Sequence, residues 1–340
     1  MTAPLSRPSA SPASASPAAA SPAAASPASA STATAQTGPP PPLASPTPLR
    51  DAALPRPVLV AGRVLATLWA DRKARIGLIV LAALIGVALL APVISPYPPA
   101  DANFARSLSP SGAHLLGTTG SGQDTLSQLL WGARVSLLVG FVAGAAASVI
   151  AVVVGLLAGY LPGAADEVLM FVTNLTLAIP ALPLMIVLAV YLAGGGVKVI
   201  VLVIIVTSWA TGARVIRSQT ATLRTRDFIA LAQFGGERLH RIVFREVLPN
   251  MTSLVTANFF AAATAAVLGE AGLEFLGLGN PTTVSWGTML YWAQNSGALL
   301  TGQWVLILAP GLCIALLAAS FSLINFGVDA LSNPRLREKS

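Results

Sequence analysis

The sequence predicts an all-α polytopic membrane protein with six transmembrane helices. Of its 340 residues, 54% are hydrophobic and only 10% are charged, and the mean hydropathy is +0.74. A soluble domain of this size needs more charge to cover its surface. The apolar residues are gathered into stretches of about 20, the length of helix that crosses roughly 30 Å of hydrocarbon. These stretches are 76–94, 137–161, 168–192, 197–213, 252–276 and 305–326.

Residues 1–55 precede these stretches and differ from them in composition. They are Ser, Pro and Ala near-repeats with a proline run at 39–42. Such a segment buries little apolar surface, so we expect a disordered or partly polyproline-like tail. It lacks the apolar core of a signal peptide. It is either a solvated extension or a tether for another protein, and a basic lead-in at 56–75 connects it to the transmembrane domain at 76–337.

The distribution of basic residues predicts the orientation in the membrane. Six spans place both termini on one side, together with the polar loop at 224–250. Most of the 20 Lys and Arg residues fall on that side, and only Arg106, Arg134 and Lys198 fall on the other. By the positive-inside rule, both termini and the 224–250 loop are cytoplasmic. The pI near 10.3 follows from this distribution and requires no nucleic-acid partner.

Several kinds of chemistry are not expected of this chain. Cys313 is the single cysteine, so no disulfide framework exists, and two histidines make a His/Cys metal site improbable. No G-x-x-x-x-G-K-[ST] motif occurs, so the chain carries no P-loop of its own. We therefore predict no catalytic, cofactor-binding or metal-binding residues and no enzyme activity.

Two transmembrane stretches carry special residues. The second holds two Gly-x-x-x-Gly pairs, Gly140 with Gly144 and Gly155 with Gly159, whose small residues let helices approach closely. They pack either within the chain or against a partner. In the third stretch, Pro180 and Pro183 are expected to kink the helix.

The segment at 96–133 precedes the second stretch on the outer side. From Leu126 to Leu137 it has an apolar stripe at helical spacing, and Asp124 or Thr125 can cap the start. We expect an amphipathic helix at the membrane surface that continues into the second span.

The 224–250 loop predicts two short helices. Phe228, Leu231 and Ala232 share one face of the first, and Gly235-Gly236 ends it. Leu239, Ile242, Val243 and Val247 then lie on one side of the second helix, and Arg238, Arg241 and Arg245 lie on the other. Pro249 suits the first turn of the following helix, where its missing N–H costs nothing.

This loop resembles the coupling loop of bacterial ABC-importer permeases. The residues that match the family pattern are Asp227, Phe228, Ala232, Gly236, Arg241, Arg245, Leu248, Pro249 and Asn250. Ala230 stands where the family has Glu, and Leu231 where it has Ala. The resemblance implies that Asp227, Phe228, Ala230, Ala232, Gly236, Arg241, Arg245 and Pro249 dock on a separate ATPase.

Three further segments resemble the dipeptide, oligopeptide and nickel branch of these permeases. They are His114-Leu-Leu-Gly-Thr with Gly122-Gln-Asp-Thr-Leu-Ser, Glu270-Ala-Gly-Leu-Glu-Phe-Leu-Gly-Leu-Gly with Ser285-Trp-Gly-Thr-Met-Leu, and the C-terminal Pro334-Arg-Leu-Arg. Family charges are missing at Thr119, Gln123, Gln128, Phe171 and Asn174, and Glu274 replaces a Ser. The resemblance covers about residues 70–337.

The resemblance implies the type I ABC-importer permease architecture, with a cytoplasmic coupling helix, in a bacterial inner membrane. The implied partners are a second homologous permease, one or two ATPases that bind ATP and Mg²⁺, and an extracytoplasmic substrate-binding protein. We interpret the chain as forming half of a path for di- or oligopeptides. The alternatives are a nickel or other small-solute importer, a stand-alone channel or secondary transporter, and a divergent regulatory subunit.

Two further groups of residues are candidate sites. The spans carry neutral polar side chains, and Asn174, Thr207, Asn258 and Asn325 are candidates for lining the path, although such groups also bond nearby helix carbonyls. Asp124, Glu270 and Glu274 are candidates for an external receptor contact. Glu270 and Glu274, one helical turn apart, are otherwise expected to be solvated acids at a helix end.

Overall fold

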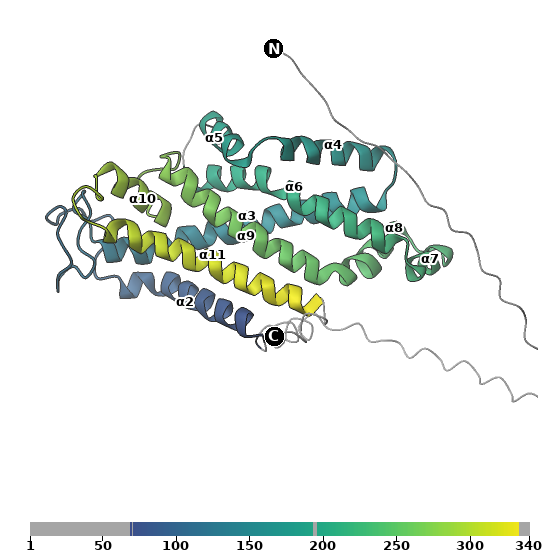
Figure 1. Cartoon of the computed structure of the whole chain (residues 1–340), viewed down its shortest axis with the longest axis horizontal. Helices are drawn as coiled ribbons and strands as arrows, with labels where there is room; N and C mark the ends of the chain where they lie inside the picture. Colours follow the sequence, from purple (N-terminus) through teal and green to yellow (C-terminus); the bar gives the residue numbers. More distant parts are fainter. Residues whose placement is uncertain (1–68, 70, 193–195, 333–340) are drawn as a thin grey trace, which may run out of the picture. The chain divides into compact units, whose positions relative to one another are not determined.

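Long apolar runs form the long helices of a bundle (Figure 1). The computed structural model describes residues 69, 71–192 and 196–332, with side chains described as far as Val328. The helices are α2 (Arg72–Ile94), α3 (Thr125–Tyr160), α4 (Ala164–Ala178), α5 (Ala181–Tyr191), α6 (Val197–Arg224), α7 (Asp227–Phe234), α8 (Leu239–Ile242), η1 (Val243–Val247), η2 (Leu248–Met251), α9 (Thr252–Phe275), α10 (Trp286–Asn295) and α11 (Val305–Ser332).

The six predicted spans each correspond to a helix or a helix pair. Within the described residues, five helical segments are long and apolar enough to cross a membrane, namely α2, α3, α6, α11 and the continuous run that ends in α9. The bent pair α4 and α5 makes a sixth if it is counted as one span. The predicted all-helical membrane fold is therefore confirmed.

The third span is broken and not merely kinked. The axes of α4 and α5 differ by 92°, and Ile179 and Pro180 between them are extended. Proline disfavours the helical conformation of the residue before it and lacks an N–H, so α4 ends before Pro180. Pro183 lies in the first turn of α5, where no N–H is needed, so it contributes nothing to the bend.

Several helices extend beyond the predicted apolar stretches. Helix α3 has 36 residues and begins at Thr125, so the surface helix and the second span are one element, as predicted. Helix α6 continues to Arg224, well past Ala213. A helix can extend beyond the hydrocarbon because its backbone hydrogen bonds are internal, so hydropathy alone does not mark its ends.

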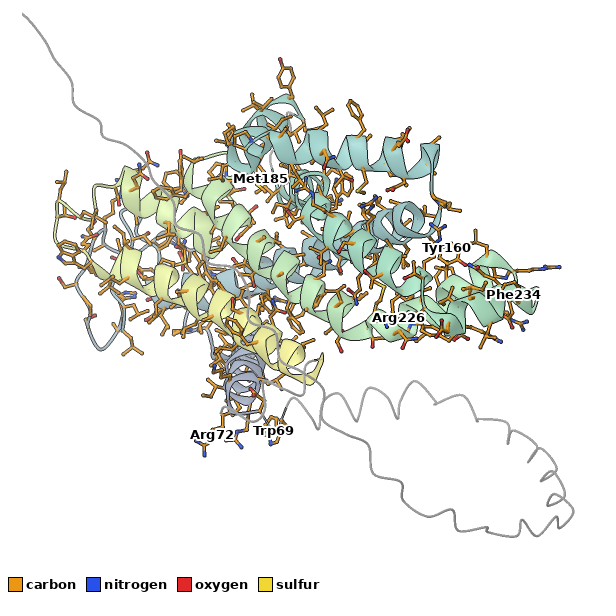
Figure 2. The ribbon with its side chains drawn as sticks, turned by 45° about the vertical axis from the view of Figure 1, so that its right-hand side comes forward. Trp69, Arg72, Tyr160, Met185, Arg226 and Phe234 are labelled. Atoms are coloured by element: carbon orange, nitrogen blue, oxygen red, sulfur yellow. The ribbon has the colours of Figure 1, made fainter. Side chains whose placement is uncertain are left out.

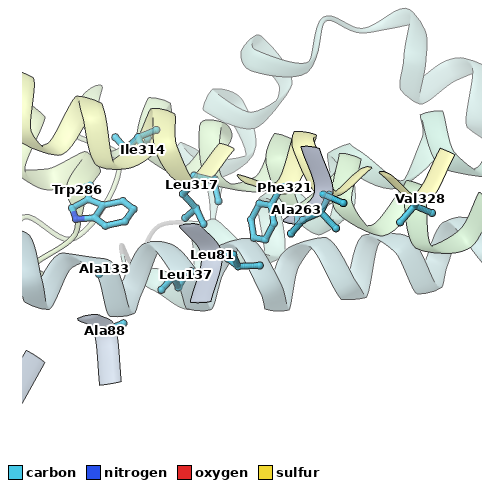
Figure 3. Packing of buried hydrophobic residues seen from close by; sticks show 14 of the residues in the cluster. Leu81, Ala88, Ala133, Leu137, Ala263, Trp286, Ile314, Leu317, Phe321 and Val328 are labelled. Atoms are coloured by element: carbon cyan, nitrogen blue, oxygen red, sulfur yellow. The ribbon is translucent and has the colours of Figure 1, made fainter. Parts of the chain in front are cut away.

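One hydrophobic cluster joins α11 to α2, α3, α9 and α10 (Figure 3). Phe321 of α11 is fully buried, and its ring meets that of Phe141 at right angles, with centroids 5.4 Å apart. Trp286 of α10 is buried at the outer end and donates its indole N–H to the carbonyl of Leu129 at 2.9 Å. The cluster fixes the outer helix α10 to the transmembrane bundle.

The glycine pairs of α3 pack within the chain. A Cβ on Gly144 would lie 2.7 Å from the Cα of Ala263, so only glycine allows α3 and α9 to approach this closely. At the other end of α3, Gly155 faces Ile216 of α6 in the same way. The predicted tail at 1–55, most of the basic lead-in and the C-terminal motif at 334–337 lie outside the described residues.

Candidate docking loop and translocation cavity

The first half of the 224–250 loop has the predicted glycine turn. Two residues separate the end of α6 from the start of α7, and Gly235 caps the C-terminus of α7. Gly236 has a φ of +73°, which glycine adopts without strain. Its N–H donates to the carbonyl of Gln233 at 3.0 Å, and the next N–H, of Glu237, donates to Ala232 at 3.2 Å. These bonds satisfy carbonyls that the helix end leaves free.

The second half is not the single amphipathic helix that we expected. Helix α8 has four residues and is followed by the π-helical η1 and the 3-10 turn η2, which leads into α9. Pro249 lies in the first turn of η2, and because it has no N–H it cannot continue regular helical bonding. The two-sided pattern is present: Ile242 and Val247 are buried, Val243 is half-buried, and Arg238, Arg241 and Arg245 are exposed. Leu239 is the exception and is exposed.

The loop is anchored to the ends of two transmembrane helices. Ile229 of α7, fully buried, packs in one cluster with Ile242, Val247 and Ile216 of α6. The side-chain amide of Gln233 donates to the hydroxyl of Tyr160, the last residue of α3, at 2.9 Å. Tyr160, Arg226 and Phe234 lie at the same end of the bundle (Figure 2). The loop therefore contacts both α3 and α6 directly.

The outward side of the loop combines apolar and basic side chains. Phe234 is 90% exposed and Leu231 is 70% exposed, while Phe228 and Phe244 are also exposed. The expected shared face of Phe228, Leu231 and Ala232 is therefore not the buried face of α7, because Ile229 is the buried residue. Ala230 and Ala232 are half-buried. We give the name docking face to eight of the exposed residues, which are Asp227, Phe228, Leu231, Phe234, Arg241, Phe244, Arg245 and Pro249.

The bundle holds a cavity of about 570 Å³ that is open on one side. It is lined by the break between α4 and α5, by α6 and α9, and by Asn325 of α11. Thr207, Asn258 and Asn325, three of the four candidates for lining the path, line this cavity. Asn258 donates to the hydroxyl of Ser148 at 3.0 Å, and Thr207 donates to a carbonyl of its own helix. The buried Oδ1 of Asn325 has no hydrogen-bond partner among the described residues. The described lining carries no charged side chain.

Asn174 is not part of this lining. Its side-chain oxygen accepts a hydrogen bond from the guanidinium of Arg214 at 2.8 Å, which fastens α4 to α6. A second contact between these helices joins Asp166 to Arg217. Spacing along the sequence did not reveal this pair, because its members are 51 residues apart. The available signal was an acid at the start of the third span and an arginine near the end of the fourth.

Asp124 is a structural residue at the start of α3. It is 1% exposed and caps the helix by accepting from the N–H of Ser127 at 2.8 Å. Its other oxygen lies 2.8 Å from Nδ1 of His114, whose ring contacts those of Tyr97 and Phe104. This burial does not support an external receptor contact at Asp124.

Glu270 and Glu274 are not the solvated acids that we expected. They are 0% and 2% exposed, respectively. The hydroxyl of Ser136 on α3 lies 3.3 Å from both carboxylate oxygens of Glu270, and the hydroxyl of Ser285 donates to Glu274. Ser285 also caps α10. The two carboxyl groups therefore join α9 to α3 and α10, and they offer no surface to a receptor.

Comparison with known families agrees with this geometry. The model of binding-protein-dependent transport system inner membrane components matches residues 151–338, more than half of the chain. The chain belongs to this family. A second model, the N-terminal transmembrane domain of oligopeptide transport permease C, matches residues 62–110. The resemblance that we saw in the sequence is confirmed, and the chain is a multi-pass inner-membrane permease subunit.

Individual relatives are similar along most of their length. A putative peptide permease of Brucella suis is 33% identical over 268 residues, which cover 78% of this chain and 88% of the relative. The dipeptide transport system permease DppC of Bacillus subtilis is 30% identical, with 78% and 83% covered. The oligopeptide transport system permease OppC of the same species is 29% identical, with 80% and 91% covered.

Proposed function

We propose that this permease subunit forms half of the translocation path of an ATP-driven importer of di- or oligopeptides. The observation that carries the proposal is the connection between the cavity and the 224–250 loop. Helices α6 and α9 both line the cavity and both lead into the loop. The dipeptide and oligopeptide permeases among the relatives support this substrate class.

The partners are those that membership of the permease family implies. A second homologous permease completes the path beside the open cavity. One or two ATPase subunits dock on the exposed apolar and basic side chains of the docking face, and they bind the ATP and Mg²⁺. An extracytoplasmic binding protein delivers the substrate. Both termini and the loop are cytoplasmic, because the basic residues concentrate on that side.

The mechanism is alternating access without covalent chemistry. Closure of the ATPases displaces the 224–250 loop, and its anchors at Tyr160 and Ile216 carry the displacement into α3 and α6. Turning a 1:99 ratio of two conformations into 99:1 requires about 5.5 kcal/mol of differential binding. That energy passes through the loop, so Phe228, Gly236 and the basic segment are the residues on which coupling depends.

The cavity lining suits a peptide backbone. Thr207, Asn258 and Asn325 offer neutral donors and acceptors that match peptide N–H and C=O groups. A neutral lining exerts no strong attraction on charged side chains, so peptides of different sequence can pass. Selection of the substrate then belongs to the binding protein.

Reconstitution of the complex into liposomes tests the proposal. The vesicles receive the binding protein, a defined mixture of di- to pentapeptides and Ni²⁺, with ATP inside or absent. We expect ATP-dependent peptide accumulation, read by mass spectrometry. Accumulation of Ni²⁺ alone favours the nickel importer, and solute movement without ATP favours a channel or secondary transporter; either result contradicts the proposal.

A further inference from the structure

The contact between Asp166 and Arg217 joins α4 to α6, two helices that both contribute residues to the cavity lining. The carboxylate of Asp166 accepts from Nε of Arg217 at 2.9 Å and from its terminal nitrogen at 2.5 Å. Such a two-point, charge-assisted contact fixes orientation as well as distance. The side chains are 22% and 38% exposed, respectively, so the pair is partly shielded from water.

A second polar contact continues the first along the same two helices. Arg214 lies one turn before Arg217 on α6, and Asn174 lies two turns after Asp166 on α4. The two contacts therefore follow each other in opposite chain directions, as in antiparallel helices. The guanidinium of Arg214 donates to Asn174 at 2.8 Å. The two contacts together form a polar ladder between α4 and α6.

Helix α4 has few other attachments. Among the described residues, Thr173 is its one buried side chain, and the hydroxyl of Thr173 bonds the carbonyl of Leu169 in its own helix. Val168, Phe171 and Leu175 are all more than half exposed. Because little apolar packing holds α4 within this chain, the polar ladder decides how closely α4 follows α6.

The ladder lies between the 224–250 loop and the cavity. Arg217 is two turns before the end of α6, and two residues separate that end from the start of α7. The other end of α4 supplies Thr176, Ile179 and Pro180 to the cavity lining. A displacement of α6 that reaches α4 therefore moves the cavity wall.

We propose that Asp166 and Arg217 are positioning residues that make α4 move with α6, so that a displacement of the 224–250 loop reshapes the cavity. The inference rests on the proposed function, because it concerns how ATP-driven movement reaches the path. A purely structural contact would stabilise the fold and leave the yield of transport per ATP unchanged.

The ratio of peptide imported to ATP hydrolysed tests this role in the reconstituted complex. We expect Asp166→Asn and Arg217→Gln to lower the ratio about fivefold or more, the range of typical coupling between sites. Hydrolysis and recovery of the complex stay near wild type. The reversed pair, Asp166→Arg with Arg217→Asp, restores much of the ratio. Glu167→Gln is the matched control, because Glu167 is an exposed acid next to Asp166 on α4 that is not part of the ladder or of the 224–250 loop.

Distances between spin labels supply a measurement that does not depend on substrate. Replacing Cys313 with Ala gives a cysteine-free chain, and Phe171→Cys on α4 with Thr222→Cys on α6 places labels at two exposed positions. We expect the same distance distribution in the ATP-free and vanadate-trapped complexes, and a broadened distribution once Asp166→Asn is added.

Each failure has its own signature. A wild-type complex that does not import peptide with ATP overturns the proposed function. If the wild-type complex works, three results overturn the positioning role alone. They are a normal ratio in Asp166→Asn, no recovery in the reversed pair, and a label distance that differs between the ATP-free and vanadate-trapped complexes.

Discussion

Gly236 offers the sharpest test of the 224–250 loop, because its effect comes from the backbone alone. A Cβ at this position would meet no atom within 4 Å, so substitution causes no clash. Its φ of +73° is the whole constraint. For a residue with a Cβ, this conformation is about 1–2 kcal/mol higher in free energy, which lowers the ratio of formed to opened turn about 5–30-fold.

Proline at Gly236 has a larger effect. Its φ is fixed near −65°, and it removes the N–H that donates to Gln233. A cost of about 3 kcal/mol or more lowers the formed-turn ratio by about 150-fold or more. We expect Gly236→Pro to abolish ATP-driven import and Gly236→Ala to reduce it, with normal insertion of both variants into the membrane.

Gly235→Ala is the matched control. Gly235 has a φ of −70°, and a Cβ there would make an ordinary contact of 3.4 Å with the carbonyl oxygen of Leu231. We expect near-normal import from this variant. Normal import by Gly236→Pro, or equal losses at Gly235 and Gly236, would refute the reasoning that the left-handed turn shapes the docking loop.

Three other predictions follow from burial and exposure, and a fourth follows from the composition of the tail. Phe234→Ser changes a side chain that is 90% exposed, so it lowers recovery of the ATPase in a pull-down without changing the melting temperature. Phe321→Ala removes a fully buried ring and lowers stability by about 3–5 kcal/mol, measured by thermal unfolding in detergent. Gly144→Leu forces α3 and α9 apart, so size-exclusion chromatography shows loss of folded protein. Deletion of residues 2–50 leaves import intact at normal expression, whereas lost uptake would give the tail a function.

The sequence predicted the elements that depend on local chemistry. Hydropathy located all six spans, because the requirement for apolar side chains in hydrocarbon is strong and local. Gly236 marked its turn, and Asp124 was correctly named as a candidate cap for α3. Thr207, Asn258 and Asn325, singled out because polar groups inside spans are few, line one cavity, and their role in a path stays a prediction.

What the sequence did not predict depends on contacts between distant segments. The burial of Glu270 and Glu274 requires the hydroxyls of Ser136 and Ser285 on other helices, and spacing along α9 cannot reveal them. Asn174 points to Arg214 and not to the cavity for the same reason. The 92° break at Pro180 was foreseen only as a kink, since a proline limits the local backbone but does not set the direction of the next helix.

The central claim is that this permease works only as part of an ATP-driven assembly. The most direct measurement is isolation of the tagged chain from native membranes in mild detergent, with the co-purified proteins identified by mass. We predict a second six-span permease and an ATPase that carries a P-loop. A chain recovered alone, stable and able to move solute in liposomes without ATP, would contradict the account.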